Sequence, residues 1–301
     1  MGLPNVIVCV GGCDDHKIPQ AAVTVFSPST STFWCLEKMS YSIALCGSVV
    51  MEDNSVFVCG GLTTTDETNR VSRYYPVHNT WESVAPLQHR WAGSGVAALG
   101  GRVYVAGGYY YVNDNWEPLR SVECYDVLTD SWQRVAQLPV DDLWGCSMVA
   151  VDDRVYMFGG ISQQRKTNAV FCYDPTSDTG SRLADMPTAR NWCCACVGPR
   201  GLVYVIGGRR SGAKYLNCVE AYDTTTNVWL KKRGMITKRS MAGCGCVDGK
   251  IYVLGGASTE EECLDSIEFY DENTDTWTMH ECRLPKAIRG FGCAVMKMQK
   301  D

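Results

Sequence analysis

Six Gly-Gly pairs divide this chain of 301 residues into repeats of nearly equal length. Each pair ends a short run of alternating β-branched, aliphatic and aromatic residues, such as Val103 to Ala106 before Gly107-Gly108. Runs of this kind predict strands, and two glycines at a strand end allow a left-handed exit and the close approach of another backbone. The pairs begin at Gly11, Gly60, Gly107, Gly159, Gly207 and Gly255, at intervals of 49, 47, 52, 48 and 48 residues. A period of this length predicts an array of one repeated unit.

An aromatic residue, usually followed by Asp, comes 14 to 18 residues after the start of each pair. These residues are Phe26, Tyr74, Tyr125, Tyr173, Tyr222 and Tyr270. Seven residues further, across a stretch rich in turn residues, lie Phe33, Trp81, Trp132, Trp229 and Trp277. In the first repeat Phe33 keeps this spacing, whereas its neighbour Trp34 does not. The fourth repeat has Gly180 at the position, which predicts a cavity or a substitute side chain there.

Each repeat ends in a segment of small residues, such as Gly93 to Ala98, which suits an innermost strand crowded around an axis. One four-stranded sheet cannot bury both of its faces alone, but sheets packed radially cover one another. We therefore predict an all-β, six-bladed propeller with four-stranded antiparallel blades. The C-terminal strand, around Arg289 to Lys297, would complete blade 1 and close the ring. Residues 1–301 would form one domain, with blades at roughly 5–40 plus 289–299, 41–88, 89–139, 140–188, 189–236 and 237–288.

Composition excludes several classes of function. The net charge of −5 argues against general nucleic-acid binding, which needs a basic face. No apolar run approaches the length of a membrane span, and the first residues contain no signal-peptide core. The 17 cysteines lie mostly in apolar runs, where a free thiol packs as a small hydrophobic group. We expect a reducing compartment, the cytoplasm or the nucleus.

The sequence predicts neither a metal site nor an enzyme. Cys194 and Cys196 share one face of a strand, but they stand in an inner strand where small residues are required. The four histidines are scattered, and no Gly-x-Ser-x-Gly, His-Glu-x-x-His or phosphate-binding loop is present. We therefore expect no metal, no cofactor and no catalytic residue.

The succession of Gly-Gly, Tyr-Asp and Trp at about 48 residues resembles the kelch repeat, and the resemblance covers essentially the whole chain. The stretch Pro4 to Val8 before the first pair, the arginines before several inner strands and the closing strand resemble the kelch domain of kelch-like (BTB–BACK–kelch) proteins. In that family the kelch domain recognises a substrate, while the BTB and BACK domains dimerise and bind a cullin–RING ubiquitin ligase. The resemblance implies a monomeric substrate-recognition domain. An actin-binding or cytoskeletal scaffold is the alternative, and a propeller enzyme of the oxidase or sialidase type is a remote one.

Two sets of loops are expected to share one face of the propeller: those after the Gly-Gly pairs and those that lead into the innermost strands. Tyr, Trp and Arg, the residue types that dominate protein interfaces, are frequent there. The loop from Tyr109 to Leu119 is longer than its counterparts. Interface chemistry and the resemblance together select Ser42, Arg90, Trp91, Tyr109, Tyr110, Trp144, Arg190, Asn191, Trp192, Arg209, Arg210, Arg239, Ser240, Arg289 and Phe291 as partner-binding residues.

Structural roles remain open for many of these residues. An arginine before an inner strand can bind loop carbonyls, and the tryptophans can pack between blades. Blade 4 offers Leu143-Trp144 where a polar pair would be expected, which suggests a more apolar pocket. If the binding role is correct, replacing Arg190 and Arg239 with Ala should abolish partner binding and leave the melting temperature nearly unchanged.

Overall fold

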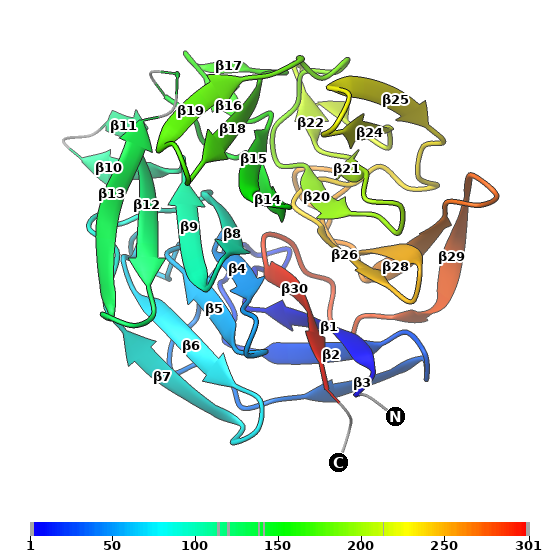
Figure 1. Cartoon of the computed structure of the whole chain (residues 1–301). Coiled ribbons are helices and arrows are strands. Elements are labelled where there is room, and N and C mark those ends of the chain that lie inside the picture. The colour runs from blue at the N-terminus through cyan, green and yellow to red at the C-terminus, as the bar shows by residue number, and fades with distance from the viewer. Residues whose placement is uncertain are drawn as a thin grey trace.

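The computed structural model describes residues 3–112, 115–118, 121–137, 139–140, 142–212 and 214–298, without the side chains of 111–112, 115–118 and 136–137. Over these residues, six four-stranded antiparallel sheets are arranged around a central axis, as Figure 1 shows. The predicted six-bladed propeller is confirmed. No described segment forms a helix long and apolar enough to cross a membrane.

Each blade extends from an innermost strand at the axis to an outermost strand at the rim. The strands of each blade are given below from the innermost to the outermost. Blade 1 contains β30 (Gly292–Lys297), β1 (Asn5–Val10), β2 (Val23–Ser27) and β3 (Thr32–Cys35), and blade 2 contains β4 (Gly47–Val50), β5 (Val56–Cys59), β6 (Val71–Tyr75) and β7 (Thr80–Val84). Blade 3 contains β8 (Gly95–Leu99), β9 (Arg102–Ala106), β12 (Ser121–Asp126) and β13 (Ser131–Gln137), and blade 4 contains β14 (Ser147–Val151), β15 (Arg154–Phe158), β18 (Val170–Asp174) and β19 (Thr179–Arg182). Blade 5 contains β20 (Cys194–Val197), β21 (Val203–Ile206), β24 (Val219–Asp223) and β25 (Val228–Lys232), and blade 6 contains β26 (Gly243–Val247), β27 (Lys250–Leu254), β28 (Ser266–Asp271) and β29 (Thr276–Arg283).

Blades 3, 4 and 5 each carry a short hairpin between their second and third strands. The hairpins are β10 (Tyr109–Val112) with β11 (Asn115–Pro118), β16 (Ile161–Ser162) with β17 (Arg165–Lys166), and β22 (Arg209–Arg210) with β23 (Lys214–Tyr215). The long loop expected from Tyr109 is the first of these. The side chains of Tyr111 and Trp116 in it lie outside the described residues.

The C-terminal strand closes the ring. β30 pairs antiparallel with β1 in a register that places Val295 opposite Ile7, so blade 1 combines both ends of the chain. Innermost strands of neighbouring blades contact one another around the axis. A Cβ on Gly245 would lie 2.5 Å from a methyl carbon of Val295, so this inner-strand position has no room for a side chain. The predicted closing strand is confirmed, and glycines occupy the inner-strand positions where neighbouring blades approach most closely, although β14 and β30 also contain the larger Met148 and Met296.

Each of these six Gly-Gly pairs forms a backbone hydrogen bond to the next blade. The Gly208 N–H donates to the carbonyl of Arg239, 2.7 Å away, and a Cβ on Gly207 would overlap the same carbonyl oxygen. Both glycines have a positive φ, of 62° and 96°. The same inter-blade bond recurs at the other five pairs, from Gly12, Gly61, Gly108, Gly160 and Gly256. The repeat therefore contains glycine because two backbones meet there.

Replacing Gly207 with Ala is expected to lower the free energy of unfolding by about 2 kcal/mol, since a left-handed conformation alone costs 1–2 kcal/mol and the carbonyl has to move as well. Gly249→Ala is the matched control, because Gly249 also has a positive φ but a Cβ there would meet nothing within 4 Å. Urea unfolding of both variants measures the difference. Equal losses for the two variants would show that the inter-blade contact contributes nothing.

The aromatic pattern builds a second set of inter-blade bonds at the rim. Between blades 4 and 5, the N–H of Ala184 in blade 4 donates to Oδ1 of Asn227 in blade 5. The carbonyl of Ala184 accepts a 2.9 Å hydrogen bond from Nε1 of Trp229 in blade 5. The Tyr222 hydroxyl donates to the same Asn227 oxygen. Blades 2, 3 and 6 repeat this arrangement through Trp81, Trp132 and Trp277, with Asn79, Asp130 and Asp275 as the acceptors.

Blades 1 and 4 depart from this pattern. In blade 1 the rings of Phe26 and Phe33 stack with 4.8 Å between their centroids. Phe33, and not Trp34, therefore occupies the position that tryptophan holds in the other blades, seven residues after the first aromatic residue. In blade 4, Gly180 lies opposite Tyr173, whose hydroxyl still donates to Asp178. The Tyr173 ring packs on Tyr104 of blade 3, with 5.7 Å between the ring centroids.

Candidate partner-binding face

The two predicted loop sets do share a face, which we call the loop face. Residues that follow the Gly-Gly pairs form β-bridges with residues that lead into the innermost strand of the same blade. Examples are Ala92 with Tyr109 and Asn191 with Arg209. The opposite face is formed by the turns between the first and second strands and between the third and fourth.

A closed ring of six peptide hydrogen bonds surrounds the axis on the loop face. Each blade contributes one residue with a φ between 52° and 67°, and its N–H donates to the carbonyl of the corresponding residue in a neighbouring blade. The ring residues are Leu45, Gly93, Gly145, Trp192, Met241 and Gly290, and their N···O distances lie between 2.6 and 3.0 Å. The rim of the channel is therefore a fixed backbone frame on which side chains differ from blade to blade.

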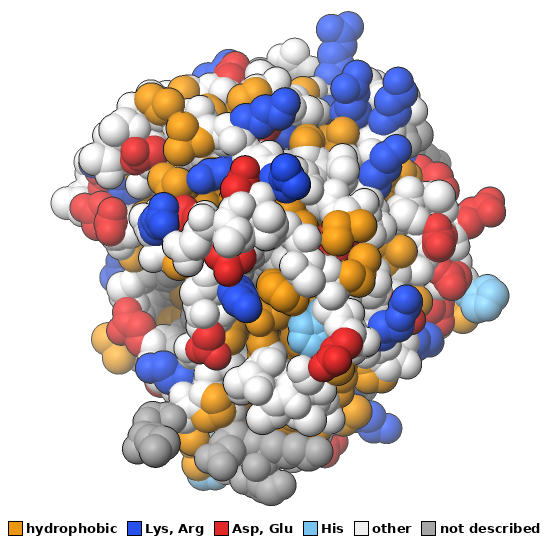
Figure 2. Space-filling view, turned by 90° about the vertical axis from the view of Figure 1, so that its right-hand side faces the viewer, with side chains coloured by type: hydrophobic (Ala, Val, Ile, Leu, Met, Phe, Trp, Pro, Cys, Tyr) orange, Lys and Arg blue, Asp and Glu red, His pale blue; other side chains and the backbone are white. Residues whose placement is uncertain are grey.

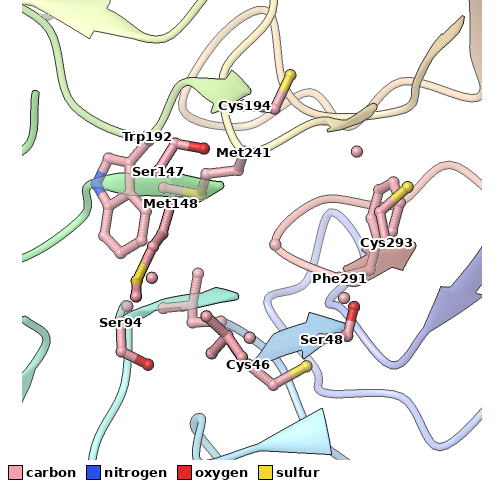
Figure 3. A pocket seen from close by; sticks show the side chains of 18 of the residues that line it. Cys46, Ser48, Ser94, Ser147, Met148, Trp192, Cys194, Met241, Phe291 and Cys293 are labelled. Carbon is pink, nitrogen blue, oxygen red and sulfur yellow. The ribbon is translucent and has the colours of Figure 1, made fainter. Parts of the chain in front are cut away.

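The channel below this ring holds a cavity of about 170 Å³. Figure 3 shows thiols, hydroxyls and apolar side chains around it, among them Cys46, Ser48, Ser94, Trp192 and Cys293. Burial raises the pKa of the Cys46 thiol to about 11, so this thiol is protonated and uncharged at neutral pH. All 17 cysteines are unpaired, and the described residues contain no cluster of three or more His, Cys, Asp or Glu that could hold a metal.

Two arginines placed at the binding surface by sequence reasoning lie inside their blades, which corrects that placement. The side chains of Arg190 and Arg239 are 0% exposed, and their guanidinium groups form ion pairs with Glu220 at 2.7 Å and with Glu268 at 2.9 Å. Arg239 also donates to the carbonyls of Gly255 and Ser266 at 2.8 Å. The alternative in which such arginines bind loop carbonyls is the one the structure shows.

The glutamate partners of these arginines were missed, although the sequence contains their signal. Glu220 and Glu268 stand two residues before Tyr222 and Tyr270, the repeated tyrosines of their blades. Glu123 has the same place before Tyr125 in blade 3. In blade 3 the position of Arg190 is taken by Trp91, and Glu123 instead faces His89, with 3.5 Å between Nδ1 and Oε1. Burial raises the pKa of the Glu123 carboxyl. A glutamate repeated at one position in three strands indicates a buried partner.

The four arginines grouped together by sequence fall at three different places relative to the ring. Arg190 and Arg239 stand two residues before their ring residues, Arg289 stands one before, and Arg90 stands three before. Arg90 is exposed, whereas Arg289 is buried and donates from Nη1 to the carbonyl of Glu260 at 2.8 Å. Of these three places, only that of Arg90, three residues before its ring residue, leaves the arginine exposed.

The remaining candidates divide into buried and accessible residues. Trp91 is fully buried in the core between blades 2 and 3, so its predicted alternative role in packing is the one observed. The other buried candidates are Tyr109, Asn191, Ser240 and Phe291. The half-buried ones are Ser42, Tyr110, Trp144, Trp192 and Arg209, and Arg210 is exposed.

Accessible aromatic and basic side chains meet on blades 3 to 6 of the loop face. Trp144 packs edge-on against Tyr109 and Trp192, with ring centroids 5.2 and 6.0 Å apart. Next to them, a surface hollow of about 690 Å³ lies between blades 5 and 6, lined by Arg210, Lys214 and Lys238 with Glu260. On the side of the molecule that Figure 2 shows, several Lys and Arg side chains gather near the top, while others are interspersed with Asp and Glu.

Comparison with known proteins agrees with the fold. The structure defines the class of this protein as a six-bladed propeller with four-stranded blades. The family model of the KLHDC2/KLHL20/DRC7 kelch-repeats domain matches residues 47–231 and 145–300. This chain therefore belongs to the kelch-repeat domain family.

Several curated relatives share this region. A kelch repeat and BTB domain-containing protein 8 from Xenopus tropicalis is 28% identical over 168 residues, covering 53% of this chain and 28% of the relative. A kelch repeat and BTB domain-containing protein 1 from cowpox virus is 24% identical over 171 residues, covering 56% of this chain and 29% of the relative. The matched part is less than a third of the length of these relatives.

Proposed function

We propose that this chain binds a protein partner on its loop face and acts as the substrate-recognition part of a cullin–RING ubiquitin ligase adaptor in the cytoplasm or nucleus. Contact with the cullin would come from BTB and BACK domains outside this chain. The relatives whose names include a BTB domain support this proposal, as do the accessible aromatic and arginine residues of the loop face.

One observation carries the choice of this face. At the six equivalent ring positions the backbone is the same, yet the residues range from Gly to Leu, Met and Trp. The residue after each Gly-Gly pair varies just as widely, being Cys13, Leu62, Tyr109, Ile161, Arg209 or Ala257. Varied side chains on a rigid, repeated frame are typical of a recognition surface. Binding through such a surface needs no catalytic group, so we propose a binding protein and not an enzyme.

Quantitative affinity purification with two matched variants tests the proposal. Arg90→Glu with Arg210→Glu alters the loop face, whereas Val77→Glu with Leu128→Glu alters turns on the opposite face. All four positions are exposed, so both variants should fold normally. We expect specific partners to be lost from the first variant and kept by the second. In the full-length protein, the cullin should stay bound to both. Loss from the opposite-face variant alone would contradict the proposal.

A further inference from the structure

Trp192 holds a place in the ring that favours glycine. Its φ is 54°, and the same ring position is glycine in blades 3, 4 and 1. A left-handed backbone is unfavourable for a bulky side chain, and such outliers gather at functional sites. The propeller therefore keeps an indole at the channel mouth against the local backbone preference.

Neighbouring residues are adapted to this indole. A Cβ on Gly93 would lie 2.6 Å from Cη2 of Trp192, and a Cβ on Gly145 would lie 3.3 Å from Cε2. The indole ring of Trp192 thus lies along the mouth of the channel over blades 4 and 3, as Figure 3 shows from the side of the cavity. In the amide orientation that satisfies both of its groups, Asn191 accepts from Trp192 Nε1 at 2.9 Å and donates to the Arg209 carbonyl at 3.1 Å. The indole is fixed in place.

Basic side chains continue from this aromatic row. Arg209 stacks on Tyr215 with 5.0 Å between the guanidinium carbon and the ring centroid, and it pairs with Glu260, which extends from an exposed loop. Arg210, Lys214 and Lys238 line the adjacent hollow and make none of the ion pairs found among the described residues. This local positive charge contrasts with the net charge of −5 of the whole chain.

From this juxtaposition we infer that Trp192 is the anchor of the loop-face site and that the partner is an extended segment carrying a large apolar side chain next to carboxylates. The apolar side chain would pack on Trp192 and Trp144, and the carboxylates would pair with the cations of the hollow between blades 5 and 6. The inference rests on the proposed function and specifies the chemistry of its partner.

A displayed library of random 12-residue peptides, selected on the purified wild-type chain, tests this inference. Trp192→Gly removes the indole and suits the left-handed backbone, so the ring of six peptide hydrogen bonds should persist. Arg210→Glu, Lys214→Glu and Lys238→Glu together reverse the charge of the hollow. The matched control reverses Arg134, Arg200 and Lys231, which are exposed on outer strands and the opposite face.

We expect selected peptides to combine a large apolar residue with Asp or Glu. Their affinity should fall at least tenfold with Trp192→Gly and with the hollow triple variant, and by less than twofold with the control. Peptides without this pattern, peptides that bind Trp192→Gly as tightly as the wild type, or the absence of any selected peptide would each overturn the inference. Partners retained by the opposite-face variant and lost from the loop-face variant would still support the proposed function, so the two failures are distinguishable.

Discussion

Replacing Arg239 with Ala is expected to lower the free energy of unfolding by about 3–5 kcal/mol, because Glu268 would be left as an uncompensated buried charge. Both side chains of this pair are 0% exposed. Glu268 has no other cation beside it among the described residues, since its remaining bonds come from the backbone N–H groups of Ile236 and Thr237. Chemical denaturation followed by tryptophan fluorescence measures the loss.

Two further variants separate the buried charge from other effects. Arg239→Met combined with Glu268→Leu removes both charges, and replacing a whole buried pair by apolar residues is often close to neutral, so most of the loss should be recovered. Arg200→Ala removes an exposed arginine and should change the free energy of unfolding by about 0.5 kcal/mol or less. An unchanged stability for Arg239→Ala would mean that the guanidinium is not buried. That result would restore the expectation from sequence, in which this residue binds a partner at no cost to the melting temperature.

Replacing Trp229 with Ala is expected to lower the free energy of unfolding by about 3 kcal/mol, the lower end of the range for aromatic truncation in a core, because the indole is half-buried. The ring packs on Tyr222 and Phe158, and its Nε1 bonds the Ala184 carbonyl of blade 4. Trp229→Phe keeps the ring contacts and removes only the hydrogen bond, so it should cost about 1 kcal/mol.

The comparison of these two variants, by urea unfolding, reports on contact between blades. If Trp229→Ala and Trp229→Phe were both neutral, the rim bonds would not hold blade 5 against blade 4. If both cost the same, the hydrogen bond and not the packing would be the main contribution.

The fold could be predicted from sequence because its repeated features encode contacts. The second glycine of each pair donates to a carbonyl in the next blade, and the first leaves room for that carbonyl. Tryptophan recurs at fixed spacing because its Nε1 bonds a backbone carbonyl of the preceding blade. The tyrosine hydroxyl donates to the Asn227 side chain, which accepts from the N–H of that same backbone residue. The acceptor of the inter-blade bond was not recognised in advance. The Asp that follows Tyr125, Tyr173, Tyr222 and Tyr270 accepts bonds within its own turn, while Asn227 and its equivalents make the inter-blade bond.

The candidate site was harder to predict, because arginines that all precede an inner strand occupy different places relative to the hydrogen-bond ring and differ in burial. Arg90 and Arg190 both precede an inner strand, yet Arg90 is exposed and Arg190 is enclosed with Glu220. The hydrogen-bond ring shows which residues are equivalent. Alignment of the lead-in segments on Gly93, Gly145 and Gly290 would have placed Trp192 at the same position and revealed a bulky residue where glycine is preferred.

Site-specific photo-crosslinking tests most directly whether partners bind the loop face. A benzoylphenylalanine introduced at Tyr110 or Arg210 would report on the loop face, and one at Val77 or Leu128 on the opposite face, where these side chains are 90% and 95% exposed. Partner proteins should crosslink to the first two positions and not to the last two. Adducts formed only at Val77 or Leu128 would contradict the assignment of the loop face as the recognition surface.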